Sequence, residues 1–128
     1  MKKALVIDDD EMDLELLRLV LTREGFHVIS TADGPQGVLL YKHHNPAIVF
    51  LDLGLPSMSG IDVLREIRNY DRNAKVYLIT GYGSSQTAEA ARQLGALEYI
   101  EKTSGIDGMI ERIRAAVQGF RQQNTKTR

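Results

Sequence analysis

The sequence predicts an α/β fold in which a five-stranded parallel sheet is covered by helices on both faces. Short apolar runs alternate strictly with segments of helical periodicity over about the first 120 residues. Several runs are apolar at every position, as expected of strands that are buried on both faces of a sheet. The chain has 128 residues, the usual size of one domain, and needs no disulfide or metal to build a core.

The first half of the chain supplies three strands and two helices. An apolar run over 4–8 is followed by a helix over 11–24, which ends before a glycine. The apolar stripe of this helix consists of Met12, Leu16, Leu17, Val20 and Leu21. A second strand is predicted over 26–30 and a third over 47–51. Between them an Asp-Gly-Pro sequence opens a helix over 33–42, because proline fits the first helical turn.

The second half repeats the alternation with three helices and two strands. In chain order these are a helix over 61–69, a strand over 75–80, a helix to about Leu94, a strand over 97–101 and a helix over 106–120. Ser84 or Ser85 is expected to cap the helix that ends near Leu94. The last helix has one apolar stripe, made of Ile106, Met109, Ile110, Ile113 and Val117. Residues 1–120 therefore form one domain, and residues 121–128 a polar, basic tail or linker.

The order of the strands follows from the handedness of their connections. Crossovers between parallel strands are right-handed, which leaves few topologies for five strands. The flavodoxin-like order 2-1-3-4-5 is the common one for a doubly wound domain of this size. It places the first, third and fourth runs, which are the most uniformly apolar, at the centre of the sheet.

Composition argues against several classes of function. The net charge is -1 and the pI is about 6.3, so the chain as a whole shows no sign of nucleic-acid or membrane binding. There is no cysteine, which rules out disulfides, thiol catalysis and cysteine-ligated zinc. The first apolar run is too short for a signal peptide or a membrane span, and we expect a cytoplasmic protein.

Polar residues able to do chemistry stand at the ends of four of the predicted strands. In chain order they are Asp8, Asp9, Asp52, Thr80 and Lys102. The carboxyl ends of parallel strands lie at one edge of the sheet, where open α/β sheets bind their ligands. We therefore expect three carboxylates, a hydroxyl and an ammonium to meet there.

This set of side chains suits a metal ion and a phosphoryl group. Neighbouring carboxylates repel each other and raise at least one pKa unless a cation lies between them. Mg²⁺ prefers oxygen ligands and usually takes one or two carboxylates together with phosphate oxygens. The carbonyl of Gly54 would complete a shell begun by Asp8, Asp9 and Asp52. With Thr80 and Lys102 nearby, the carboxylate of Asp52 would be a nucleophile that forms an aspartyl-phosphate.

Four stretches resemble the receiver domains of bacterial two-component response regulators, a family that includes stand-alone chemotaxis regulators. The resemblance covers about residues 2–120, and the matching stretches are 4–10, 50–60, 78–81 and 98–102. It implies that Asp52 accepts a phosphoryl group from the phosphohistidine of a histidine kinase or phosphotransfer protein. It also implies that Asp8 and Asp9 hold Mg²⁺ with Asp52, and that Lys102 contacts the phosphoryl oxygens.

The resemblance further implies a conformational switch. Thr80 would swing toward the phosphate, and Tyr99 would turn inward behind it. This motion would reshape the face made by the fourth helix, the fifth strand and the fifth helix, where a downstream protein target binds. The domain would act as a monomer or a phosphorylation-dependent dimer, without direct contact to nucleic acid or membrane. Both a stand-alone regulator and the receiver part of a longer protein fit this sequence.

The sequence departs from the family pattern at a few positions. Thr103 follows Lys102 where the family usually has proline, and a trans bond is expected because a non-proline cis bond costs about 3 kcal/mol. Ser59 replaces a more frequent aspartate. Gly54 and Tyr82 occupy the two positions that tune dephosphorylation in the family.

Each candidate residue also has a plainer explanation. Acids such as Asp9 and Asp10 favour the N-terminus of a helix. Thr80 fits a strand end as a β-branched residue, and Tyr99 fits a half-buried aromatic position. Lys102 fits a solvated charge. The histidines, which lie before strands at the opposite edge, are expected to be surface residues and are His27, His43 and His44.

Other classes of protein share parts of this pattern. A receiver-like adaptor that works without phosphorylation is suggested by Thr103. A small phosphatase with an aspartate nucleophile would need a second aspartate where Gly54 stands, so turnover on small molecules is not expected. A flavin mononucleotide carrier would need a Ser/Thr/Gly-rich turn after the first strand, where acids stand instead. There is no P-loop motif, so ATP is not expected to be the direct donor.

Overall fold

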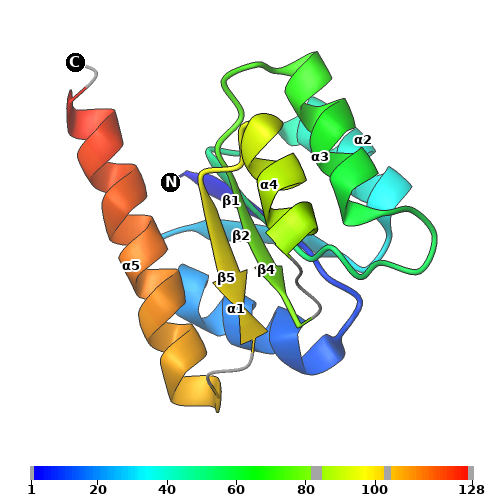
Figure 1. Cartoon of the computed structure of the whole chain (residues 1–128). Helices are drawn as coiled ribbons and strands as arrows, with labels where there is room; N and C mark the ends of the chain where they lie inside the picture. The colour runs from blue at the N-terminus through cyan, green and yellow to red at the C-terminus, as the bar shows by residue number, and fades with distance from the viewer. Residues whose placement is uncertain (1, 82–84, 103–104, 127–128) are drawn as a thin grey trace.

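The computed structural model describes residues 2–81, 85–102 and 105–126. Within these residues five parallel strands form one sheet in the order β2-β1-β3-β4-β5. The strands are β1 Lys3–Ile7, β2 His27–Thr31, β3 Ile48–Leu51, β4 Val76–Thr80 and β5 Glu98–Glu101. The helices are α1 Glu11–Arg23, α2 Gly34–His44, α3 Gly60–Tyr70, α4 Ser85–Gln93 and α5 Gly105–Lys126. The predicted fold class and strand order are confirmed (Figure 1).

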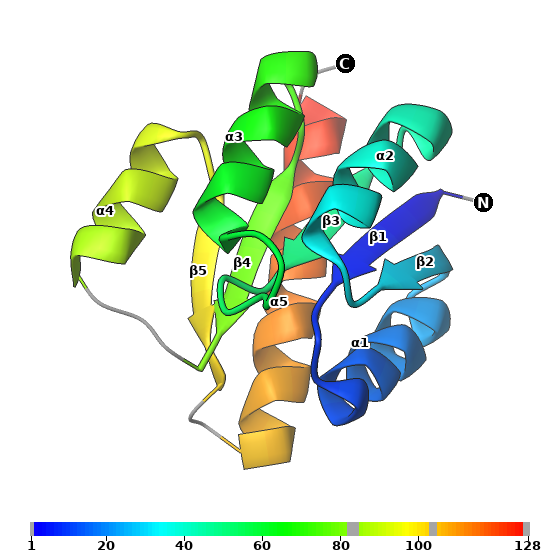
Figure 2. The same cartoon turned by 90° about the vertical axis from the view of Figure 1, so that its right-hand side faces the viewer.

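Helices cover the sheet on both faces. Helices α1 and α5 lie on one side, and α2, α3 and α4 lie on the other (Figure 2). Successive side chains of a strand point to opposite faces, so β1 contributes Ala4 and Val6 to one core and Leu5 and Ile7 to the other. The two hydrophobic layers explain why the central runs carry no polar alternation.

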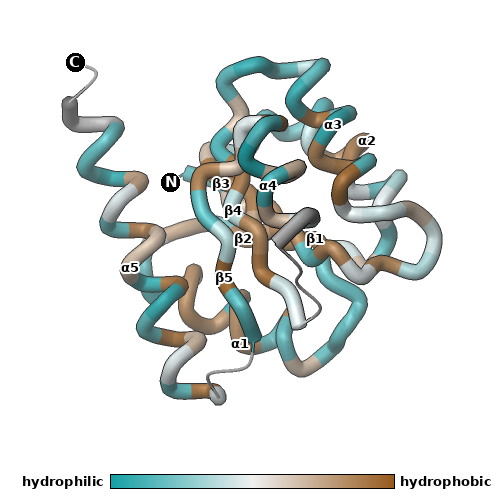
Figure 3. The backbone as a smooth tube through the Cα atoms, viewed as in Figure 1, coloured by the Kyte–Doolittle hydropathy of each residue, from teal (hydrophilic) through white to brown (hydrophobic). Residues whose placement is uncertain are grey.

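The position of a strand in the sheet sets how apolar it is. Every residue of β3 and β4 is buried, and so is all of β1 except its first residue. The edge strands β2 and β5 are mostly half-buried and carry polar side chains. In Figure 3 the central strand β4 carries hydrophobic brown, whereas the edge strand β5 is hydrophilic teal at both ends.

Two local features fix the backbone around the carboxyl edge of the sheet. Asp10 is the N-cap of α1, and its side chain accepts hydrogen bonds from the backbone N–H groups of Met12 and Asp13. Gly60 begins α3 in close contact with the loop after β3. A Cβ at Gly60 would lie 2.4 Å from Cα of Leu53 and 2.7 Å from the carbonyl oxygen of Asp52. Only glycine therefore allows α3 to approach this loop.

Two residues of the predicted apolar stripes are at the surface. Met12 is 76% exposed and Ile106 is 61% exposed. Each lies in the first turn of its helix. Both line a surface pocket between α1 and α5, so the apolar stripe continues past the part of each helix that is buried.

Helix α5 continues to Lys126, six residues beyond the predicted end at Phe120. Arg121 holds this extension against the end of α1. Its guanidinium donates to the Glu24 carboxylate at 3.0 Å and to the Glu24 carbonyl oxygen, and it lies over the ring of Phe26. Arg114 of α5 makes a second ion pair with Glu24 at 3.6 Å. The predicted polar tail therefore begins as helix.

Some predictions fall outside the described residues. Ser84, Tyr82 and the Lys102–Thr103 peptide bond are among these, so the cap of α4 and the loop after Lys102 stay predictions. Among the residues that are described, no helix has both the length and the apolar composition needed to cross a bilayer.

Candidate metal centre at the carboxyl edge of the sheet

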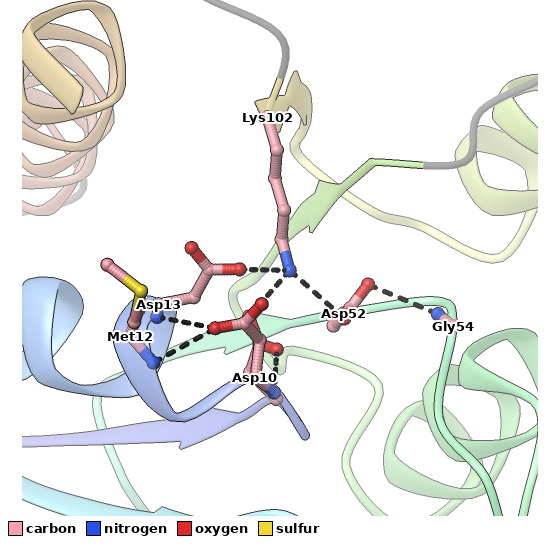
Figure 4. A network of polar contacts seen from close by, with 7 residues as sticks. Asp10, Met12, Asp13, Asp52, Gly54 and Lys102 are labelled. Atoms are coloured by element: carbon pink, nitrogen blue, oxygen red, sulfur yellow. Dashed lines mark hydrogen bonds and ion pairs between the residues drawn. The ribbon is translucent and has the colours of Figure 1, made fainter. Parts of the chain in front are cut away.

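Parallel pairing brings the predicted site residues to one edge. Ile7 pairs with Leu51, so Asp8 and Asp52 leave neighbouring strands at the same level, and the Asp52 N–H donates to the Ile7 carbonyl at 2.8 Å. On the far side of β3, Thr80 ends β4, and Lys102 follows β5 directly. Figure 4 shows the Lys102 side chain reaching from the end of β5 toward carboxylates that come from the ends of other elements.

Three carboxylates converge there. Asp8 is fully buried, Asp52 is 5% exposed, and Asp9 is exposed. One oxygen of each side chain lies within 4.8 Å of the others. Such a group of hard oxygen donors, two buried and one open to solvent, fits the ligand preference of Mg²⁺ with room for water or phosphate oxygens.

Gly54 contacts this group through its amide. Its N–H donates to Oδ1 of Asp52 at 3.1 Å, which leaves Oδ2 of Asp52 facing Lys102. The predicted role of the Gly54 carbonyl in a metal shell therefore stays a prediction. Gly54 does line the pocket that opens above Asp52, which has a volume of about 510 Å³. The walls of this pocket are Asp9, Asp10, Asp13, Asp52, Gly54, Gly81 and Lys102.

Lys102 pairs with three carboxylates at once. Its Nζ lies 2.7 Å from Oδ2 of Asp13, 2.9 Å from Oδ2 of Asp8 and 3.1 Å from Oδ2 of Asp52. Burial would lower the pKa of Lys102, but hydrogen bonds from its ammonium to Asp13 and Asp8 and the charges of Asp8 and Asp52 raise it well above its ordinary value. Lys102 is therefore a permanent cation in the pocket rather than a solvated surface charge.

Asp8 responds to the same surroundings in the opposite sense. Burial raises its pKa to about 7, although a hydrogen bond from the Asp10 N–H and the ammonium of Lys102 both favour the ionised form. Lys102 is shared among three acids and does not fully compensate this buried charge. A second cation beside Asp8 would restore its ionisation, which is a further physical reason to expect a metal here.

Asp13 was not predicted from the sequence to belong to this site. A first-turn acid is ordinarily explained by the helix dipole, and the spacing from Asp10 does not reveal which way its side chain points. The sequence did offer one signal. Asp13 lies in the first turn of the helix that follows β1, and that turn is close to the carboxyl edge of the sheet. Asp10, in contrast, serves as a helix cap, the plainer of its two explanations.

The two predicted switch residues lie in the neighbouring strands β4 and β5. Thr80 is fully buried at the end of β4. Tyr99 pairs with Leu78 in the sheet, and because side chains alternate, Thr80 and Tyr99 point to the same face. Burial raises the pKa of Tyr99, helped by the charge of Glu101, and its hydroxyl is buried without a hydrogen-bond partner among the described residues. This geometry agrees with the predicted coupling without testing it.

The histidines form a separate group. His43 and His44 end α2 with their rings 4.8 Å apart, and Lys3 lies 3.4 Å from Nδ1 of His44. His27 begins β2 at the same, amino-terminal edge of the sheet. None of the three belongs to the carboxylate group at the opposite edge.

Comparison with known proteins agrees with this geometry. Residues 4–114 match the response regulator receiver domain. The chain belongs to this family. It is 40% identical over 117 residues to the transcriptional regulatory protein KdpE of Mycobacterium tuberculosis. The aligned residues cover 91% of this chain and 51% of KdpE. It is 36% identical over 118 residues to the chemotaxis protein CheY of Treponema pallidum, with 90% and 82% covered.

A solved structure also matches this receiver domain. The crystal structure of the CheX-CheY-BeF3-Mg+2 complex from Borrelia burgdorferi aligns with a TM-score of 0.80 and 34% identity over 91% of this chain and 89% of that one. The chain spans about half the length of the transcriptional regulators among its curated relatives. The predicted family is confirmed, and its relatives include transcriptional regulatory proteins and chemotaxis proteins.

Proposed function

We propose that this receiver domain accepts a phosphoryl group on Asp52 from the phosphohistidine of a histidine kinase or phosphotransfer protein. One observation carries the proposal. The nearly buried carboxylate of Asp52 shares a 4.8 Å cluster with two other carboxylates and lies 3.1 Å from the Lys102 ammonium, at the base of an open pocket. Family membership supports the same chemistry.

The transfer is a nucleophilic displacement at phosphorus. A carboxylate oxygen of Asp52 forms the new O–P bond while the N–P bond of the donor phosphohistidine breaks, and the released imidazole takes a proton from solvent. Lys102 neutralises charge on the phosphoryl oxygens, and the Gly54 N–H orients the carboxylate. Asp8, Asp9 and Asp52 would hold Mg²⁺, which supplies further charge neutralisation when bound.

The output is a change in the face made by α4, β5 and α5. Thr80 and Tyr99 would carry it, because they share one face of neighbouring strands. Tyr99 lines a pocket of about 260 Å³ together with Ala88, Ala91 and Arg92 of α4, which leaves room for the ring to move. We expect a downstream protein to read this face, with the domain as a monomer or a phosphorylation-dependent dimer, and no direct contact with nucleic acid.

The test is formation of a phosphoryl adduct. The protein is incubated with acetyl phosphate and Mg²⁺, and its intact mass is measured with and without excess EDTA. We expect one phosphoryl group on the wild type, dependent on Mg²⁺, and none on Asp52→Asn. Asp62→Asn, an exposed acid of α3, is the matched control and should be phosphorylated normally. Absence of any adduct on the folded wild type would favour the phosphorylation-independent adaptor.

A further inference from the structure

Asp13 makes the shortest of the three ion pairs to Lys102, at 2.7 Å. It lies in the first turn of α1 and lines the pocket, and its side chain is 18% exposed. It is not one of the three carboxylates that converge as possible metal ligands. Asp13 therefore acts on this site through Lys102 and through its charge.

An ammonium group has three N–H donors, and here three carboxylates surround it. Two of them, Asp8 and Asp52, would turn toward a metal ion or carry the phosphoryl group under the function proposed above. Asp13 makes no other ion pair among the described residues and is not one of the clustered carboxylates. Asp13 therefore keeps its ion pair with Lys102 when Asp8 and Asp52 give up theirs, and it holds the ammonium near α1.

The charge balance of the pocket points the same way. Lys102 and one divalent cation would neutralise Asp8, Asp9 and Asp52, and Asp13 leaves one negative charge in excess. Asp10 also lines the pocket, but its carboxylate accepts N–H groups at the positive end of α1. An excess negative charge attracts a divalent cation and repels a phosphoryl group.

We propose that Asp13 is a positioning residue that tethers the Lys102 ammonium to α1 and thereby favours the metal ion over the phosphoryl group. This inference rests on the proposed function of Asp52. Without Asp13, Lys102 lies only on Asp8 and Asp52, where it competes with the metal, and one of its donors is free for a phosphoryl oxygen. Removal of the charge therefore weakens metal binding and strengthens phosphoryl binding.

The experiment measures both affinities on the same variants. Mg²⁺ alone is titrated into the domain and followed by amide NMR, and beryllofluoride is then titrated at saturating Mg²⁺. For Asp13→Asn we expect Mg²⁺ to bind about twofold to fivefold more weakly and beryllofluoride about twofold to fivefold more tightly, the range of a partly exposed ion pair. Asp13→Glu should restore both values toward the wild type.

Glu15→Gln is the matched control. It removes the same charge from the same helix, but its side chain is 79% exposed and its ion pair, to Arg18, spans 4.0 Å. Both affinities should stay at the wild-type values. Thermal unfolding verifies that each variant is folded. If Asp13→Asn does not fold, Asp13→Ala is used in its place.

A purely structural role for Asp13 would shift both affinities in the same direction or neither, and either result overturns the proposal. If wild-type protein binds Mg²⁺ but no beryllofluoride, the proposed function of Asp52 fails. The tether is then judged by the Mg²⁺ titration alone, where an unchanged affinity in Asp13→Asn rejects it.

Discussion

The ammonium of Lys102 donates a hydrogen bond to Oδ2 of Asp52 at 3.1 Å, although 50 residues separate them in the chain. Strand β4 and the two crossovers that flank it bring them together. Lys102 thus lies beside the proposed nucleophile before any metal or donor arrives. A cation already in place has two effects, since it attracts a phosphoryl group and competes with a metal ion.

Lys102→Met separates these two effects. Loss of the ammonium should tighten Mg²⁺ binding by about tenfold, because no cation has to be displaced from Asp8 and Asp52. The same change should abolish or strongly weaken beryllofluoride binding. Isothermal titration calorimetry measures both, with Lys42→Met, a surface lysine over the Tyr70 ring, as the control. Equal Mg²⁺ affinity in Lys102→Met and wild type would show that the ammonium does not obstruct the metal.

The raised pKa of Asp8 predicts that the free energy of unfolding depends on pH. Its pKa is raised from 3.8 to about 7, so between these pH values the folded state keeps a proton that the unfolded state has released. Raising the pH across this window therefore favours unfolding, by up to about 4 kcal/mol from this one group in metal-free protein. Below pH 3.8 Asp8 is protonated in both the folded and the unfolded state, and above about 7 it is ionised in both. Stability therefore changes with pH through this group only between these two values, and the loss reached at about pH 7 persists at higher pH.

Asp8→Asn should remove this contribution. In urea denaturation with EDTA, the variant should gain stability relative to wild type as the pH rises from about 4 to 7. Saturating Mg²⁺ should stabilise the wild type more at the upper end of the window than at the lower end. Asp9→Asn, at an exposed position, provides the control in the same buffer with EDTA and should follow the wild-type pH profile. A constant difference between Asp8→Asn and wild type would contradict the shifted pKa.

Gly60→Ala should destabilise the domain by about 1–3 kcal/mol, because the added methyl group meets backbone atoms of Leu53 and Asp52. The clash also displaces the Asp52 loop, so Mg²⁺ affinity should fall. Gly119→Ala is the counterpart in α5, where an added Cβ meets nothing within 4 Å, and it should stabilise by about 0.5–1 kcal/mol. Chemical denaturation measures both changes, and a neutral Gly60→Ala would show that α3 can move away from the loop.

Tyr41→Phe tests a partly buried polar contact far from the pocket. The Tyr41 hydroxyl donates to Oδ2 of Asp71 at 2.7 Å and ties α2 to the residue that ends α3. Loss of a hydrogen bond to a charged group should cost about 1.5–3 kcal/mol. Tyr70→Phe, on an exposed neighbour whose ring packs edge-on against Tyr41, should have no measurable effect in the same denaturation assay. Similar losses in the two variants would mean that ring packing and not the hydrogen bond stabilises this corner.

The sequence was sufficient to predict the sheet and most of the site. A parallel sheet brings the carboxyl ends of its strands together. The polar residues that directly follow the apolar runs can therefore be predicted to lie near one another without knowledge of side-chain geometry. Asp8, Asp9, Asp52 and Lys102 were found in this way, and the structure brings them together. Their roles in phosphoryl transfer remain predictions for the experiments above.

The remaining features depend on contacts that a local pattern does not contain. The direction of the Asp13 side chain depends on how α1 lies over the sheet. The exposure of Met12 and Ile106 depends on which parts of α1 and α5 other side chains cover. The extension of α5 depends on Arg121 reaching Glu24, a partner 97 residues away in the sequence.

The pairing of Arg114 and Arg121 with Glu24 has a mechanical consequence. Glu24 closes α1, so these two arginines fasten α5 to α1 at the pole of the domain farthest from the carboxylates. We expect these contacts to hold the two helices together at that end. Under the proposed function, the movement of the face made by α4, β5 and α5 would then be largest in α4, in β5 and at the amino-terminal end of α5.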